Sequence, residues 1–269
     1  MQPKGCWSGA VKLSETKLGP ILEAVEARAE ERRLSGQEFP GTQNGGRDAF
    51  VEALRSGPLS ILAEHKRKAP SAGVLETADT VEARCLAYAE QGASAISVLT
   101  EQDHFDGKLD HLIRASQAGL PRLRKDFILT PWMVEESATA GADAILLMAV
   151  CLQGSLLSEL TAQAQELGMA VLCEIHDPEE LERAVAAKPD CLGVNARDLR
   201  SFVIDFQTTL DLLPQVPSEF VKIAESGIHE YEQLQQVRAA GADAALVGTA
   251  LMKEAGCLRE WADRLREEA

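Results

Sequence analysis

The sequence predicts an α/β protein, a (β/α)8 TIM barrel with an N-terminal helical extension. From Leu59 onwards, a short apolar run, a polar loop, an amphipathic helix and a Gly or Pro turn recur eight times. Eight such units in about 200 residues match a closed parallel barrel. Three segments also end a helix in the same way, with a glycine at the C-cap before the next strand: 91–95, 140–144 and 240–244. A doubly wound open sheet is the alternative.

The residues ahead of this repeat predict two helices. From Lys17, apolar residues recur at helical spacing, and a second short helix ends at the turn 56–58. The apolar positions are Ile21, Leu22, Val25 and Ala29 in the first helix and Phe50, Val51 and Leu54 in the second. We therefore expect residues 1–58 to form a helical extension packed on the barrel. Residues 59–269 would form the barrel itself, in a single domain overall.

The eight expected strands are short and mostly apolar, as strands buried on both faces are. They span 60–63, 95–99, 121–124, 144–148, 170–173, 191–194, 221–224 and 244–247. In a parallel barrel the carboxyl ends of all strands meet at one mouth, where barrel enzymes carry their active sites. The residues that end these strands are therefore the candidates for chemistry.

Charge and composition exclude several classes of protein. A net charge of −15 argues against sequence-independent nucleic-acid binding, so an anionic ligand would need a local basic site. No apolar run approaches the roughly 18 residues that span a bilayer, so no membrane partner is expected. The start, Met1–Gly5, lacks the apolar core of a secretory signal. We expect a cytoplasmic protein with free thiols at its six scattered cysteines: Cys6, Cys85, Cys151, Cys173, Cys191 and Cys257.

Acidic and basic residues follow five of the eight strands. They lie in Glu64–Lys68, Lys125–Asp126, Glu174, Asn195–Asp198 and Glu225–Gly227. Lys125 lies between Leu123 and Phe127, and a lysine in a partly apolar mouth is expected to have a lowered pKa that suits proton donation. Opposite charges confined in one cavity also push pKa values apart, which separates proton donors from acceptors. The alternative interpretation is a salt-bridged rim without catalytic function.

The last two strands predict a phosphate site. Ser226–Gly227 and Gly248–Thr249 place glycines and hydroxyls where barrels commonly bind phosphate on backbone amides, although each glycine could also serve a tight turn. His65 and His176 lack a partner at metal-ligand spacing, so we interpret them as polar rim residues and expect no metal. Glu179 and Glu180 are interpreted as charges at a helix start.

These segments together resemble the indole-3-glycerol phosphate synthase family of tryptophan biosynthesis. The resemblance is carried by 61–71, 97–107, 123–127, 172–175, 193–199 and 224–228, and it extends from about residue 17 to 265. Its most specific part is the succession of Lys-Asp-Phe at 125–127, Asn-x-Arg-Asp-Leu at 195–199 and Ala-Glu-Ser-Gly at 224–227.

The resemblance implies closure of the indole ring of 1-(2-carboxyphenylamino)-1-deoxyribulose 5-phosphate, a small anionic substrate, with loss of CO2 and water and without a cofactor. It implies that Lys125 is the general acid, that Lys66 holds the substrate carboxylate, and that Glu174 and Glu64 handle protons during dehydration. Asn195 and Arg197 would orient the substrate and Glu225 would tune the lysines. The remaining implied contacts are Ser226, Gly227, Gly248 and Thr249 to phosphate, and Phe105, Phe127, Leu146, Leu172, Leu199 and Pro70 around the ring and first loop.

Three residues depart from the family pattern. Ala69 replaces a serine, His65 an aliphatic residue and Lys108 a serine. They favour, as an alternative, a diverged non-catalytic barrel that binds a sugar phosphate. A second alternative is an aldolase in which Lys125 forms a Schiff base with a carbonyl. The sequence predicts either a monomer or a small homo-oligomer.

Overall fold

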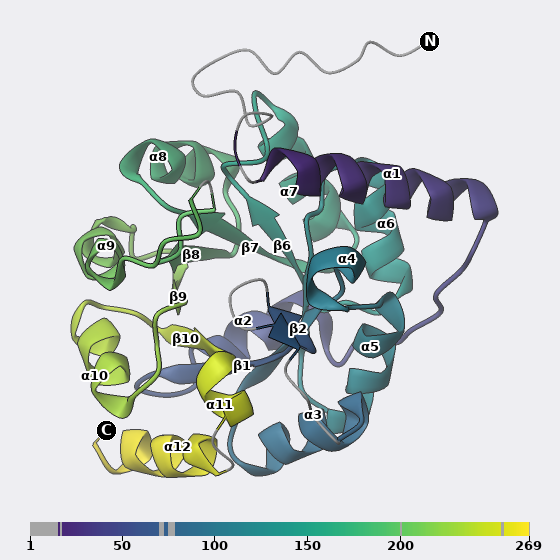
Figure 1. Ribbon diagram of the computed structural model, residues 1–269. Coiled ribbons are helices and arrows are strands. Elements are labelled where there is room, and N and C mark those ends of the chain that lie inside the picture. The colour runs from purple at the N-terminus through teal and green to yellow at the C-terminus, as the bar shows by residue number, and fades with distance from the viewer. Residues whose placement is uncertain are drawn as a thin grey trace.

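The computed structural model describes residues 16, 18–69, 73–74, 79–199, 201–253 and 256–268. Eight parallel strands close into a barrel in the order β1-β10-β9-β8-β7-β6-β5-β4, with helices around it (Figure 1). The strands are β1 (Ser60–His65), β4 (Ala95–Leu99), β5 (Arg122–Lys125), β6 (Ala144–Met148), β7 (Ala170–Ile175), β8 (Cys191–Asn195), β9 (Val221–Glu225) and β10 (Ala244–Val247). The predicted barrel is confirmed.

The helices follow the strands as the sequence predicts. They are α3 (Val81–Glu90), α4 (Gln102–Phe105), α5 (Leu109–Arg114), α6 (Pro131–Thr139), α7 (Leu156–Glu166), α8 (Pro178–Ala187), α9 (Phe206–Leu212), α10 (Tyr231–Ala239), α11 (Thr249–Lys253) and α12 (Cys257–Glu267), with 3-10 turns η2 (Ala115–Ala118) and η3 (Leu213–Gln215). A two-stranded antiparallel ribbon, β2 (Lys68–Ala69) with β3 (Gly73–Val74), follows β1 and was not predicted. Strands of two residues are too short to show a periodic pattern.

Several strands run further toward the mouth than their apolar residues indicated. β1 continues to His65, β7 to Ile175, β8 to Asn195 and β9 to Glu225. The ladder continues through the polar residues because they are buried: Asn195 pairs with Glu225, Glu174 with both Met148 and Gly193, and Glu64 with Ser97. The candidate acids and bases are therefore mostly strand residues, held by main-chain hydrogen bonds.

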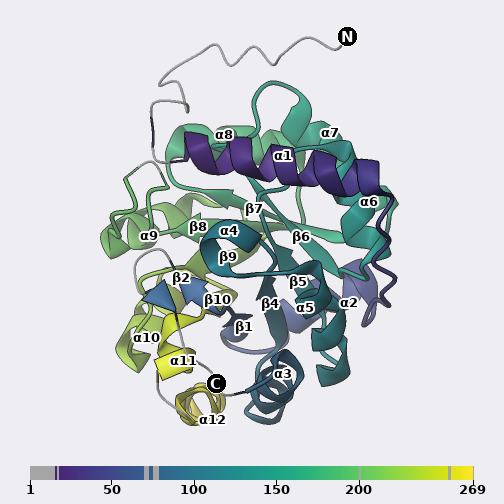
Figure 2. The same ribbon diagram turned by 45° about the vertical axis from the view of Figure 1, so that its right-hand side comes forward.

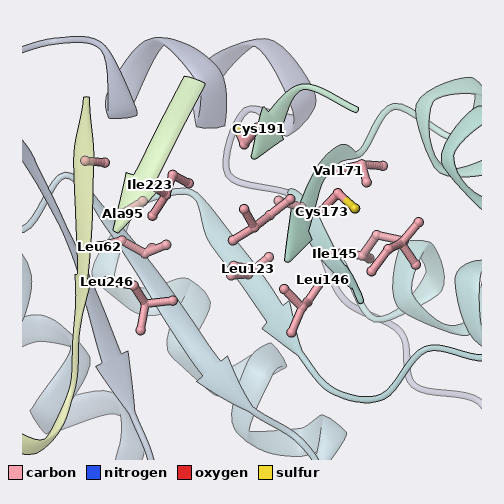
Figure 3. Close-up of a cluster of buried hydrophobic side chains, with 14 of the residues drawn as sticks. Leu62, Ala95, Leu123, Ile145, Leu146, Val171, Cys173, Cys191, Ile223 and Leu246 are labelled. Atoms are coloured by element: carbon pink, nitrogen blue, oxygen red, sulfur yellow. The ribbon is translucent and has the colours of Figure 1, made fainter. Parts of the chain in front are cut away.

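Alternation along the strands places apolar residues beneath the polar mouth. Because side chains of a strand alternate between its faces, the residue two positions before a mouth residue also faces the barrel interior. Leu62 precedes Glu64 and Leu123 precedes Lys125 in this way, and both leucines are fully buried. Figure 3 shows these two leucines gathered with other apolar side chains among the strands. The mouth therefore rests on a packed apolar core.

Two helices precede β1. Helix α1 (Gly19–Ser35) crosses the open end of the barrel (Figures 1 and 2), where Arg32 makes a bidentate pair with Glu136 of α6 at 2.7 and 3.1 Å. Helix α2 (Gly46–Leu54) lies at the other end, where the Gly46 N–H donates to Asp143, the residue before β6. The division at residue 58 stays a prediction, and residues 1–15 lie outside the described part. No helix among the described residues is long and apolar enough to cross a membrane.

Candidate active site

A cavity of about 320 Å³ opens at the carboxyl ends of the strands. Fifteen of the seventeen site residues expected from the sequence line it, together with residues of α1 and the loops. The fifteen are Glu64, Lys66, Phe105, Lys125, Phe127, Leu146, Glu174, Asn195, Arg197, Leu199, Glu225, Ser226, Gly227, Gly248 and Thr249. Residues far apart in the sequence therefore meet in one place, as the barrel prediction required.

Two expected contacts do not line this cavity. Leu172 is fully buried on the inner face of β7, two residues before Glu174, so it belongs to the layer beneath the mouth. Alternation along the strand places it below the polar residues, which favours a barrel-core residue, and its contact with the substrate ring stays a prediction. Pro70 lies outside the described residues.

Lys125 is held between two carboxylates. Its Nζ donates to Glu225 Oε2 at 3.0 Å and lies 3.3 Å from Glu174 Oε2, and all three side chains are at most 15% exposed. Burial alone would lower the pKa of Lys125, but Glu225, Glu174 and Glu64 outweigh it and raise that pKa. The lowered pKa expected from the sequence is therefore wrong, since the apolar neighbours Leu123 and Phe127 do not reveal the three acids across the barrel.

The two carboxylates that flank Lys125 have different pKa values. Burial raises the pKa of both, and Lys125 lowers both. Glu174 is further stabilised as an anion by His176 and Asn195, so its pKa falls below the usual range, whereas the pKa of Glu225 rises under burial and the nearby charge of Glu174. Two buried acids that share one cation cannot ionise equally. The predicted separation of pKa values is confirmed in direction.

Lys66 and Glu64 form a second pair beside the first. Lys66 Nζ donates to Glu64 Oε1 at 2.6 Å, and the pKa of Glu64 is lowered because Lys66 and Lys125 outweigh the effect of burial. Gly248 lies against this pair: a Cβ at that position would overlap Glu64 Oε1 and lie 3.0 Å from Lys66 Nζ. Gly248 therefore makes room for the ion pair, a function that its place beside Thr249 did not indicate.

Gly193 in β8 is a site residue that the sequence analysis missed. A Cβ there would overlap Glu225 Oε1 and lie 3.0 Å from Leu172 Cδ1. A glycine inside a strand often marks a close approach of another group, and here that group is the carboxylate that holds Lys125. The signal was present in the sequence, because Gly193 interrupts an otherwise apolar run.

Of the two histidines that were interpreted as rim residues, His65 is buried and the side chain of His176 is 9% exposed. His65 is 1% exposed and lies edge-on to His111 of α5, with ring centroids 6.1 Å apart, because it points from β1 away from the barrel interior. His176 Nε2 lies 3.3 Å from Glu174 Oε1 and its Nδ1 lies 2.9 Å from Glu180 Oε2. Glu180 lies in the first turn of α8, as expected of a helix-start charge, and it is 1% exposed because its carboxylate turns inward to His176.

The rim beside β9 and β10 holds the four residues predicted to bind phosphate. Ser226 and Gly227 both have left-handed backbone angles, with φ of 63° and 75°, which turns the chain sharply after β9. A left-handed serine costs conformational energy, and such strain is concentrated at functional sites. Gly248 follows β10, and Thr249 begins α11. All four residues line the cavity.

The remaining wall includes residues that the sequence did not reveal. Glu101 is 4% exposed and accepts hydrogen bonds from the backbone N–H groups of Asp103, His104 and Phe105, so it fixes the short helix that carries Phe105. Ile21 of α1 also lines the cavity, which gives the N-terminal helix a part in the wall. Cys85, Cys151, Cys173 and Cys191 are buried free thiols, as expected, and Cys257 is buried.

Solved structures share the fold. A structure titled "Native KDPGal structure" is 18% identical with a TM-score of 0.57 and covers 78% of this chain and 95% of its own. N-acetylmannosamine-6-phosphate 2-epimerase from Clostridium perfringens is 17% identical with a TM-score of 0.59, covering 80% and 95%. At these identities the similarity supports the barrel alone.

Sequence relatives are much more similar. The family model described as indole-3-glycerol phosphate synthase matches residues 19–261. Proteins of that name from Variovorax paradoxus and Acidithiobacillus ferrooxidans are 42% and 44% identical, over 86% and 77% of this chain and 86% and 80% of theirs. A relative from Salinibacter ruber is 40% identical over 86% of this chain and 87% of its own. With its barrel and its mouth of paired lysines and glutamates, this chain belongs to the indole-3-glycerol phosphate synthase family.

Proposed function

We propose that this chain closes the indole ring of 1-(2-carboxyphenylamino)-1-deoxyribulose 5-phosphate, with loss of CO2 and water, by acid–base catalysis in the cavity at the barrel mouth. Family membership supports the reaction. The observation that carries the proposal is the placement of Lys125 between Glu174 and Glu225, with Lys66 and Glu64 in the same cavity.

Lys125 acts as the general acid of ring closure. The acids around it raise its pKa, so it is protonated at neutral pH and can donate to the ribulose carbonyl oxygen as negative charge develops there. Glu225 orients the ammonium group through its 3.0 Å hydrogen bond. A buried cation that is already oriented stabilises such a transition state more than a cation that must first be reoriented and lose its bound water.

Lys66 binds the carboxylate that leaves as CO2, and it can serve as a second acid when the hydroxyl departs. Glu174 accepts a proton during dehydration, for which its lowered pKa keeps it ionised, and Glu64 assists. Asn195 accepts a hydrogen bond from the Arg197 N–H at 2.9 Å, which fixes the loop where both residues meet the substrate.

The phosphate and the aromatic ring of the substrate bind to different residues of the cavity. Ser226, Gly227, Gly248 and Thr249 take the phosphate, which suits small residues at the ends of the last two strands. Phe105, Phe127, Leu146 and Leu199 enclose the aromatic ring. This local site allows a protein of net charge −15 to bind an anion.

The alternative of a Schiff-base aldolase is disfavoured by the same geometry. A lysine that attacks a carbonyl must be neutral, and enzymes obtain this by lowering its pKa. Here the pKa of Lys125 is raised by its carboxylate partners. Borohydride treatment of the protein with the ketose substrate is therefore expected to trap no adduct, and a trapped adduct at Lys125 would favour the aldolase.

The proposal is tested by the variant Glu174→Gln, which keeps the volume of the side chain but cannot accept a proton. We expect turnover to fall by about 10²–10⁴ while the affinity for a reduced, non-reactive substrate analogue stays roughly unchanged. Equilibrium titration beside steady-state kinetics measures both. A large loss of affinity with turnover intact would make Glu174 a binding residue. The cytoplasmic location and the monomeric or small homo-oligomeric state stay predictions.

A further inference from the structure

We propose that His176, held in place by Glu180, is a positioning residue that fixes the orientation and the ionised state of the Glu174 carboxylate. The inference rests on the proposed function, in which Glu174 accepts a proton. His176 is not among the residues that line the cavity, so it would act through Glu174 and not on the substrate.

Glu180 holds both the backbone and the ring of His176. Its Oε2 accepts the His176 backbone N–H at 2.9 Å and lies 2.9 Å from the ring Nδ1. Glu180 is fixed in turn, because its own N–H donates to Asp177 Oδ1 at 2.8 Å at the start of α8. The ring orientation is therefore set by a buried carboxylate on a helix, outside the cavity.

This orientation places the other ring nitrogen within ion-pair distance of Glu174. His176 Nε2 is buried, has no hydrogen-bond partner elsewhere among the described residues, and lies 3.3 Å from Glu174 Oε1. The second oxygen, Glu174 Oε2, lies 3.3 Å from Lys125 Nζ. One oxygen of Glu174 thus faces a ring fixed by the scaffold, while the other faces the proposed acid.

Charge balance gives His176 an electrostatic part as well. Four buried carboxylates, those of Glu64, Glu174, Glu180 and Glu225, lie at this end of the cavity, and the cations near them are Lys66, Lys125, His176 and the half-buried Arg197. The nearby thiols Cys151 and Cys173 stay neutral, because burial raises their pKa values. Burial lowers the pKa of His176, but Glu174 and Glu180 outweigh it and raise that pKa to about 10.

Loss of the imidazolium would leave Glu174 and Glu180 without the cation that lies between them. Since an uncompensated buried charge is costly, the pKa values of both carboxylates would rise, and Glu174 would take up a proton at a higher pH than it does beside the ring. A protonated Glu174 cannot accept a proton from the substrate. The loss of activity should therefore be greatest at low pH.

The test compares kcat as a function of pH in the wild type, His176→Gln and Glu179→Gln. Glu179 is the exposed neighbour of Glu180 on the same helix turn, so Glu179→Gln is a matched control that should leave the profile unchanged. For His176→Gln we expect the loss of turnover to be about tenfold greater at pH 5.5 than at pH 8.5, which requires the pKa of the base to rise to about 6.5 in the variant. An equal loss at both pH values would overturn the inference.

A second measurement needs no variant. Side-chain nitrogen chemical shifts in the wild type, assigned by through-bond correlation, should show His176 as an imidazolium at pH 8, and a neutral ring would overturn the inference. Glu174→Gln distinguishes a failure of the proposed function from a failure of the inference about His176. If that variant keeps its turnover, the proposed function of Glu174 fails and the inference with it; if turnover falls but the His176→Gln profile does not shift, the inference alone fails.

Discussion

Replacement of His65 by leucine should remove an acid-sensitive element from the fold. His65 is 1% exposed, and neither ring nitrogen has a hydrogen-bond partner in the described part of the chain. Burial, with smaller effects of His111, Arg84 and Arg67, lowers its pKa to about 4. The folded protein therefore holds a neutral imidazole in an apolar layer between β1 and α5.

The sign of the pH dependence follows from the unfolded chain, where the histidine pKa is about 6.5. A lowered folded pKa means that this stability is fully present above about pH 6.5 and is lost as the pH falls toward 4. Between pH 8 and pH 5, linkage gives a loss of about 2 kcal/mol, or roughly 5 °C in melting temperature for a chain of this size. A leucine has no such loss.

Thermal melts of the wild type and His65→Leu at pH 8 and pH 5 measure the effect. From pH 8 to pH 5, the melting temperature of His65→Leu should rise by roughly 5 °C relative to that of the wild type. Any packing difference is common to both pH values and cancels. The reasoning fails if the difference between the two proteins is the same at both pH values.

Two further predictions concern the proposed active site. Lys125→Ala should fold normally by circular dichroism but lose about 10²–10⁴ in turnover, because a positioned general acid contributes that much, and activity within about threefold of the wild type would contradict its assignment. Gly193→Ala should lose on the order of 10² in turnover, because the new Cβ displaces Glu225 from Lys125. Gly57→Ala, where a Cβ meets nothing within 4 Å, is the control; equal kinetics for both alanine variants would show that Glu225 has room to move.

The barrel could be predicted from the sequence because its repeat is local. Each unit carries its own apolar run, amphipathic helix and Gly or Pro turn, so neither the closure nor the convergence of the strand ends required any long-range contact to be known. The length of the strands was underestimated where a polar residue such as Glu174 continues the ladder inside the mouth.

Long-range partners explain what the sequence could not reveal. The two carboxylates that raise the pKa of Lys125 are 49 and 100 residues away, so its flanking apolar residues predicted the wrong direction. His65 lies beside Glu64 and Lys66 in sequence but points to the opposite face of β1, where it meets His111. The function of Gly193 likewise depends on Glu225, which lies on the neighbouring strand.

The most direct test of the account is conversion of synthetic 1-(2-carboxyphenylamino)-1-deoxyribulose 5-phosphate by the purified protein. We expect one indole-3-glycerol phosphate and one CO2 for each substrate consumed, followed by indole absorbance and by release of label from the carboxyl carbon. In Lys125→Ala both products should appear at a rate lower by about 10² or more. Tight binding of the substrate with no product from the wild type, or an undiminished rate in Lys125→Ala, would contradict the account.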